Sequence, residues 1–209
     1  MYKYKSEDEE YFSYYCDELK AQGFIKEFGY EVSKFDLSPK YSRSYLKAGK
    51  RKELHKEEHI YKSSSITADF TIIWTKKAEN IFYLNPLKPI HGNVKDIPFR
   101  LVRNTTADLI SCIEVKPIYE GSISSSISFP LKMKQLQYQR GIYIQKIKPF
   151  SRKDEDCLFQ KSFTPLKVIA LEKYKRDTNT NSKGDSKLRY KVRTLEVFLR
   201  DTVLKENKG

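Results

Sequence analysis

Two short apolar segments constrain the fold of this 209-residue chain more than any other feature of its sequence. Residues 68–75 read Ala-Asp-Phe-Thr-Ile-Ile-Trp-Thr, and residues 109–115 read Leu-Ile-Ser-Cys-Ile-Glu-Val. Both are rich in β-branched and aromatic side chains, which indicates buried strands. The sequence therefore predicts a sheet with a covered, apolar interior.

Neighbouring segments predict the elements that surround these two strands. Residues 6–23 are expected to form a helix, because Ser6 and Glu9 have the spacing of a capping box and Gly23 supplies a stop. The other expected elements are a strand over residues 24–32, a basic helix over residues 129–140, a strand over residues 142–147 and a closing helix over residues 195–203, for which a strand over residues 188–199 is the alternative. This order is typical of the α/β class, with a mixed sheet covered on both faces.

Three segments are expected to lie outside the sheet. Residues 33–65 are polar and basic and predict a long excursion with one short helix. Residues 85–104 hold three prolines and predict a loop or insertion. Residues 173–187 predict a flexible segment, so we expect one domain over residues 1–172 and a basic extension over residues 173–209.

The net charge of +13 narrows the choice of partner more than any other bulk property. It is unevenly distributed, because residues 130–153 carry seven basic side chains and no acidic one. A solvated lysine-rich surface is the alternative explanation, but clustering of this kind favours a polyanion such as nucleic acid.

Several classes of protein are excluded. No stretch approaches the roughly 20 apolar residues that a membrane-spanning helix needs, and the first residues lack the apolar core of a secretory signal. The three cysteines, Cys16, Cys112 and Cys157, are far apart, so we expect neither a zinc pair nor a short disulfide loop. An intracellular, reducing compartment is therefore expected.

Asp69, Glu114 and Lys116 are the strongest candidates for catalysis. Side chains alternate along a strand, so Glu114 and Lys116 share one face while Val115 points into the core. If the two apolar strands are neighbours, Asp69 adds a second carboxylate, which suits Mg²⁺, with Mn²⁺ as a substitute. A lysine beside such an ion can orient water towards phosphorus, so we expect phosphodiester hydrolysis. A structural ion pair between Glu114 and Lys116 is the alternative.

These residues stand in a longer pattern that resembles the PDDEXK nuclease superfamily, in particular small phage endonucleases described as Holliday junction resolvases. The resemblance covers roughly residues 6–166 and implies a three-layer α/β/α restriction-endonuclease-like core. Its blocks are Ser6-x-x-Glu9, Gly23-Phe24-Ile25, Phe35-Asp36-Leu37-Ser38, Ala68-Asp69-Phe70, Ile72-Ile73-Trp74, Ile113-Glu114-Val115-Lys116-Pro117, Gly141-Ile142-Tyr143-Ile144 and residues 159–165.

The resemblance implies a role for each residue of the site. Asp69 and Glu114 would bind the metal, with the Val115 carbonyl as a further ligand, and Lys116 would be the catalytic lysine. Glu9 would be the acidic residue that reaches the metal from the first helix. The capping box explains Glu9 equally well, and the next acid, Glu10, replaces it if the register is shifted by one.

The chain departs from the family pattern in two places. The 45-residue gap between Asp69 and Glu114 is unusually long, so an insertion must loop out between them. Asp108 is therefore a rival acid, although a strand would place it about 20 Å from Glu114. Met133-Lys134 stands where the resembling proteins often carry Gln-Lys.

The basic helix and the polar excursion supply candidate nucleic-acid contacts. Lys132, Lys134 and Arg140 are expected to contact the DNA backbone, with an affinity that falls as salt rises; for Lys134 a solvated helix face is the alternative. Three tyrosines set among lysines are candidates for stacking on exposed bases, with ordinary surface positions as the alternative: Tyr41, Tyr45 and Tyr61.

The polar excursion also contains a competing motif. His55-Lys56-Glu57-Glu58-His59 has the letters of the His-x-x-Glu-His zinc-peptidase pattern, and on a helix its two histidines would share a face. The surrounding segment is rich in lysine and shows neither an apolar stripe nor a third ligand, which argues against a peptidase.

The sequence thus predicts a Mg²⁺-dependent endodeoxyribonuclease, with branched or Holliday junction DNA as the candidate substrate. A homodimer is expected, because a two-fold substrate favours a two-fold enzyme. The expected location is cytoplasmic, that of the infected host cell if the protein is phage-encoded, with the virion as the alternative. A catalytically inactive DNA-binding or virion-associated protein of the same fold is the second hypothesis, since the charge argument survives without catalysis.

Overall fold

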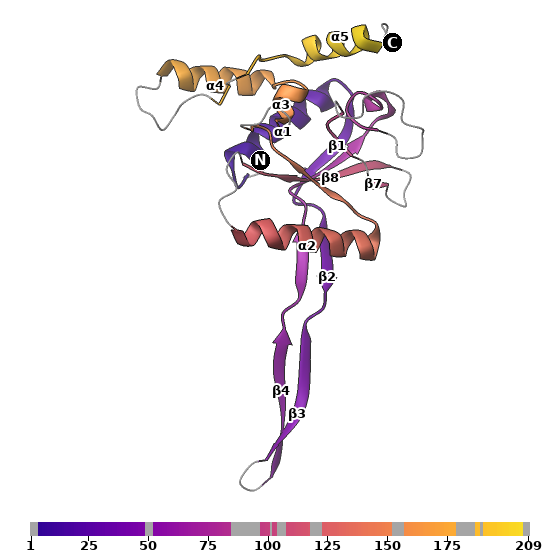
Figure 1. The fold of residues 1–209 in the computed structure, drawn as a ribbon, viewed down its shortest axis with the longest axis vertical. Helices are drawn as coiled ribbons and strands as arrows, with labels where there is room; N and C mark the ends of the chain where they lie inside the picture. Colours follow the sequence, from indigo (N-terminus) through magenta and orange to yellow (C-terminus); the bar gives the residue numbers. More distant parts are fainter. Residues whose placement is uncertain are drawn as a thin grey trace.

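The chain folds around a mixed β-sheet that has different helices on its two sides, with a long two-stranded ribbon projecting from one end (Figure 1). A computed structural model describes residues 4–48, 52–84, 97–100, 102–103, 108–117, 123–151, 157–178, 187–188 and 190–206. The helices are α1 (Glu7–Ala21), η1 (Lys76–Ala78), α2 (Ile123–Arg140), α3 (Leu158–Lys161), α4 (Leu166–Thr178) and α5 (Leu195–Glu206). The strands are β1 (Ile25–Tyr30), β2 (Lys34–Ser38), β3 (Tyr41–Ala48), β4 (Glu53–Tyr61), β5 (Ser64–Thr67), β6 (Phe70–Trp74), β7 (Val102–Arg103), β8 (Leu109–Val115) and β9 (Ile144–Ile147).

The strands predicted from apolar patterns form the central sheet. Its order is β1-β6-β8-β7, with β9 also paired to β8. β6 runs antiparallel to both β1 and β8, whereas β9 runs parallel to β8. The prediction of an α/β fold with a mixed sheet is confirmed.

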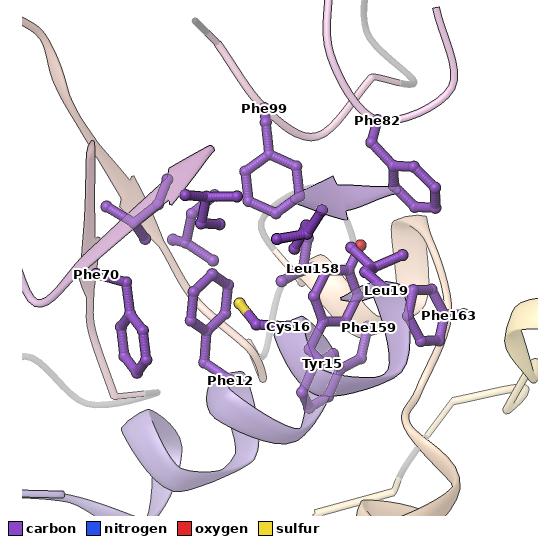
Figure 2. Close-up of a cluster of buried hydrophobic side chains, with 14 of the residues drawn as sticks. Phe12, Tyr15, Cys16, Leu19, Phe70, Phe82, Phe99, Leu158, Phe159 and Phe163 are labelled. Atoms are coloured by element: carbon purple, nitrogen blue, oxygen red, sulfur yellow. The ribbon is translucent and has the colours of Figure 1, made fainter. Parts of the chain in front are cut away.

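One face of the sheet is covered by α1. Its apolar side chains recur at helical spacing and pack on alternate residues of β6 and β8, including Ile113 of β8. Figure 2 shows Phe12 of α1 beside Phe70 of β6 in this cluster. The helix begins as predicted, because the Ser6 hydroxyl accepts the Glu9 N–H at 3.2 Å. It is followed by Gly23, whose φ of +73° lies in the left-handed region that glycine tolerates.

The opposite face is covered by α2 (Figure 1). Met133 and Leu136 pack there against Cys112 of β8 and Ile144 of β9, together with Leu37 and Ile66 from the foot of the ribbon. The two clusters use alternate side chains of β8, as the two-residue period of a buried strand requires. No helix in the described part of the chain is long and apolar enough to cross a membrane.

The polar excursion is a ribbon rather than a loop with a helix. β2 pairs with β5, and β3 pairs with β4, so residues 34–67 run outward and back as two successive antiparallel ladders. The predicted short helix is therefore wrong in the described part of this segment. Nearly all residues of β3 and β4 are exposed, so their polar sequence lacks the apolar alternation from which strands are usually recognised.

The C-terminal region also differs from its prediction. α4 extends to Thr178, so the first part of the segment expected to be flexible is helical; residues 179–186 lie outside the described part. The predicted domain boundary after residue 172 falls inside this helix. The predicted closing helix is confirmed as α5, the alternative strand is wrong, and Leu195 and Phe198 join the cluster around α1. Most of the predicted insertion over residues 85–104 lies outside the described residues.

Candidate active site

Asp69 and Glu114 lie side by side on neighbouring strands. β6 pairs with β8 so that Phe70 faces Ile113, and the next step of this register places Asp69 opposite Glu114. Directly opposed residues of an antiparallel pair project from the same face. In agreement with this, the Asp69 Oδ2 atom accepts the Val115 N–H at 2.8 Å. The two predicted carboxylates therefore converge at the end of the ladder.

The backbone around Asp69 is held on both sides. Glu31, at φ +52° after β1, donates its N–H to the Asp69 carbonyl at 2.8 Å. The preceding residue, Ala68, donates to the Ser33 carbonyl at 3.0 Å. These bonds fix the short link between β5 and β6, and Asp69 stands in that link.

Lys116 lies beside the two carboxylates. Its ammonium donates to the Glu114 Oε1 atom at 2.5 Å, as the shared strand face predicts, and lies 5.6 Å from the centre of the Phe129 ring of α2. Its side chain is 24% exposed and that of Glu114 is 14% exposed. The pair is therefore shielded by α2 but accessible from solvent.

The electrostatics of this cluster centre on Asp69. Burial, followed by the neighbouring Glu114 charge, raises the pKa of Asp69 to about 7, and Glu9 acts in the same direction. The Val115 N–H and the Lys116 ammonium lower that pKa and offset part of the effect. Two carboxylates that resist being charged together are stabilised by a cation.

Glu9 lies at the rim of this cluster, with one oxygen already bonded. Its Oε2 atom accepts the Tyr30 hydroxyl at 2.6 Å and the Lys5 N–H at 2.9 Å. Glu9 thus caps the residue before Ser6 instead of completing the predicted capping box, and it influences the Asp69 pKa as well. Tyr30 was not predicted, because its partner lies 21 residues away in the sequence. Glu10 is exposed and accepts the Tyr14 hydroxyl, away from the cluster.

Asp108 is not part of the site. It lies just before β8, at the end of that strand opposite to Glu114, and forms an exposed ion pair with Lys26 at 3.3 Å. Asp108 and Glu114 therefore lie at opposite ends of β8, as the predicted strand length requires.

The donor atoms of the cluster suit a hard divalent cation. The N–H and C=O of one strand residue point to the same edge, so the Val115 carbonyl shares the edge at which its N–H meets Asp69. Asp69, Glu114 and this carbonyl are oxygen donors of the kind that Mg²⁺ binds while keeping several waters. Among the described residues no group of three or more His, Cys, Asp or Glu side chains is placed to hold a metal ion.

The predicted DNA-contacting residues of α2 are partly occupied by the ribbon. Lys132 donates to the Ser65 carbonyl of β5 at 3.0 Å, and Arg140 donates to the Asp36 carbonyl of β2 at 3.1 Å. Lys134 is exposed. Two of the three cationic side chains therefore hold the foot of the ribbon, whatever further contacts they make.

Two glutamines of α2 strengthen the same attachment. Gln135 and Gln139 both donate to the Leu37 carbonyl, at 3.0 and 2.9 Å. This role was not predicted, because amide side chains on a helix carry no sequence signal of the backbone carbonyls that they contact. Met133 of the same helix is buried against β8 and β9.

The zinc-peptidase pattern is contradicted by its secondary structure. His55 and His59 lie on strand β4, where residues four apart are separated by about 13 Å instead of one helical turn. His59 Nδ1 is hydrogen-bonded to the Ser42 hydroxyl across the ribbon at 2.7 Å. The motif therefore lacks the helix on which its metal-binding geometry depends.

Comparison of the chain with protein-family models, with curated proteins and with solved structures found no match. Inference about function therefore rests on the geometry of Asp69, Glu114 and Lys116 and on the surfaces around them.

Proposed function

We propose that this protein is a Mg²⁺-dependent endonuclease of the PDDEXK type that hydrolyses phosphodiester bonds in DNA. The observation that carries the proposal is the convergence of Asp69 and Glu114, from separate strands, beside Lys116. A purely structural ion pair needs only Glu114 and Lys116. The Asp69 carboxylate, whose pKa is raised, makes the folded protein less stable, and a functional role would explain its presence.

The roles of the residues follow from their atoms. Asp69, Glu114 and the Val115 carbonyl would hold the ion, and Mn²⁺ would substitute for Mg²⁺. When bound, the ion would supply charge neutralisation at the phosphoryl oxygens and a lower pKa for water. Lys116, which is hydrogen-bonded to Glu114 in this structure, would orient the attacking water. Glu9, which keeps its bond to Tyr30, contributes negative charge from the rim.

The proposal extends to fold type and substrate. Placement of α1 and α2 on opposite faces of the mixed sheet supports a three-layer restriction-endonuclease-like core (Figure 1). The basic surplus of the chain supports DNA as substrate, with branched or Holliday junction DNA cut by a homodimer in the cytoplasm, that of the host cell if the protein is phage-encoded.

The test is cleavage of linear, single-stranded, flap and four-way junction DNA in Mg²⁺, in Mn²⁺ and in chelator. We expect cleavage of at least one DNA form in either metal, none in chelator, and none by Asp69→Asn. Absence of cleavage for every DNA form in both metals contradicts the proposal.

A second candidate function is DNA binding without catalysis. One observation favours it: the Lys116 ammonium already compensates Glu114, and Glu9 is bonded to Tyr30 and Lys5. Tight binding of the same DNA forms with no metal-dependent cleavage would select this candidate.

A further inference from the structure

The outer part of the ribbon is an exposed two-stranded arm, formed by β3 and β4 (Figure 1). Of its described residues only Ser42 is partly shielded. An isolated two-stranded hairpin is at best marginally stable in water. The arm therefore contributes little to the stability of the fold. Its exposed side chains are available to contact a partner.

The register divides the arm into two chemically different faces. Opposed residues share a face, and residues two apart along a strand share it as well. The aromatic-basic face contains Tyr41, Arg43, Tyr45, Lys47, Leu54, Lys56, Glu58 and Tyr61; a register shift between Tyr41 and Ser42 brings Tyr61 opposite Tyr41. The acidic face contains Ser42, Ser44, Leu46, Ala48, Glu53, His55, Glu57 and His59. The rings of Tyr41 and Tyr61 lie 6.3 Å apart, which agrees with this division.

Charge is separated between these two faces. Arg43 of the aromatic-basic face is paired with Glu58 at 2.8 Å, whereas Lys47 and Lys56 stand opposite Leu54 and Tyr45. The acidic face carries two glutamates and no lysine or arginine. One side of the arm therefore attracts a polyanion, and the other side repels it.

The same separation argues against a second copy of this chain as the occupant. A two-fold dimer brings the same face of each arm together. Contact between two aromatic-basic faces would bring lysines against lysines, and contact between two acidic faces would bring Glu53 and Glu57 against their copies. Both contacts are destabilised by repulsion between like charges. Nucleic acid is complementary to the aromatic-basic face without such a conflict.

The foot of the arm is fixed relative to the candidate active site. β5 runs from the arm to Thr67, and Asp69 follows two residues later. Four side chains of α2 bind backbone carbonyls of β2 and β5, as described above. DNA held by the arm would therefore have a defined position relative to the carboxylates.

We propose that the aromatic-basic face of the arm lies in the major groove of duplex DNA beside the site of cleavage. This inference rests on the proposed function for its substrate. β3 spans about 26 Å, or roughly eight base pairs, and the B-DNA major groove is wide enough for a two-stranded ribbon. The deep, narrow major groove of A-form RNA is too narrow for such a ribbon, so duplex RNA should not bind the arm in this way.

Cysteine protection tests which face meets DNA. The native cysteines are buried, so a thiol introduced at an exposed position reacts selectively with a maleimide. Tyr45→Cys and Leu46→Cys are adjacent, exposed and on opposite faces. Saturating duplex DNA in chelator should slow modification of Tyr45→Cys several-fold and leave Leu46→Cys nearly unchanged, and duplex RNA should protect neither.

Other protection patterns would overturn the proposal. Equal protection of both thiols, or protection of neither, contradicts insertion by one face. Protection that follows protein concentration without DNA would identify a second copy of the chain as the occupant. If duplex RNA protected the Tyr45→Cys thiol as well as duplex DNA does, insertion of the arm into the DNA major groove would be contradicted.

Binding measurements with matched variants provide an independent test. Lys47→Gln with Lys56→Gln should raise Kd for duplex DNA roughly ten-fold and reduce the salt slope of log K by about 2. The control, Lys161→Gln with Lys173→Gln, removes two exposed lysines from α3 and α4 and should change neither quantity as much. Equal effects of the two double variants would contradict a role for the arm.

The outcomes for arm and nuclease are separable. If the Tyr45→Cys and Leu46→Cys proteins show one-sided protection but the wild-type chain cuts no DNA with Mg²⁺, the proposed function fails and the arm remains a DNA-binding element. If the wild-type chain cuts DNA but the two cysteine variants show no one-sided protection, the arm proposal alone fails.

Discussion

At the scale of single residues, the Asp69 carboxylate destabilises the metal-free fold and is suited to binding a cation. Its carboxylate stands opposite Glu114 and is partly buried, so the charged form is disfavoured in the folded protein. A carboxyl group with a pKa near 7 gives up its proton readily when a cation arrives. The same residue should therefore weaken the metal-free protein and strengthen the metal-bound one.

The first prediction concerns stability against pH in chelator. Because the folded pKa of Asp69 is raised from its ordinary 3.8 to about 7, its contribution is most favourable below pH 4 and is lost as pH rises through 7. Asp69→Asn has no charge to lose, so it should be more stable than wild type at pH 8, by about 2 kcal/mol after allowance for partial exposure. Urea unfolding at pH 4 and pH 8 measures this difference, with Asp108→Asn as the control. A wild-type advantage at pH 8 would contradict it.

The second prediction is that a bound metal ion stabilises wild type more than Asp69→Asn at pH 8. Binding to the folded state alone raises stability, so millimolar Mg²⁺ or Ca²⁺ should increase the melting temperature of wild type at pH 8. Asp69→Asn and Glu114→Gln should respond much less, and Asp108→Asn should respond like wild type. An equal response from all four proteins would show that the ions bind elsewhere.

The third prediction concerns the bond between Tyr30 and Glu9. Tyr30→Phe removes a 2.6 Å hydrogen bond to a carboxylate that is 7% exposed, which should cost about 1–2 kcal/mol. Tyr14→Phe removes an exposed bond to Glu10 and should cost less than half as much. Chemical denaturation compares the two variants, and equal losses would contradict a supporting role for Tyr30.

At the scale of elements, the apolar segments were predictable and the arm was not. β8 contributes buried side chains to both faces, and β6 is buried on one face and half-buried on the other, so their apolar sequences predicted both strands and placed Asp69 and Glu114 at their ends. The arm is exposed on both faces and carries no hydrophobic period. α2 begins at Ile123 rather than at the predicted residue 129, because the backbone remains helical through Pro130.

Side-chain geometry set a further limit on prediction. Alternation along β8 predicted that Glu114 and Lys116 share a face, and their hydrogen bond agrees with this. The contacts of Glu9, Lys132 and Arg140 depend on elements far away in the sequence. Those partners become visible only when α1, α2 and the ribbon are placed in space.

The fourth prediction tests how α2 holds the ribbon. Gln135→Ala with Gln139→Ala removes both donors to the Leu37 carbonyl, which should increase amide hydrogen exchange in β2 and β5 while leaving β6 and β8 protected. Gln137→Ala, at an exposed position of the same helix, is the control. Unchanged exchange in β2 would contradict the attachment.

At the scale of the whole molecule, the C-terminal helices belong to the apolar assembly on α1. Phe163 stacks on Tyr15 with ring centres 4.4 Å apart, and Phe198 lies 5.5 Å from Phe82. The buried Glu172 of α4 accepts the Tyr11 hydroxyl at 2.7 Å. The polar composition of residues 173–209 concealed the contact of Phe198, because only one stripe of α5 is apolar.

The fifth prediction follows from this packing. Leu195→Ala should lower the free energy of unfolding by about 2–3 kcal/mol, since it empties a buried position in the main cluster. Leu166→Ala, at a position that is 60% exposed, should have little effect. Equal stability of the two variants would show that α5 is a separate extension, as the predicted boundary after residue 172 implies.

The most direct test of a metal-dependent site is the rate of four-way junction cleavage against Mg²⁺ concentration for four proteins. Wild type and Asp108→Asn should give the same saturable curve, and Asp69→Asn and Glu114→Gln should be at least about a hundred-fold slower at every concentration. Cleavage by Asp69→Asn and Glu114→Gln at the wild-type rate would contradict the central claim that these two carboxylates act together on a divalent ion.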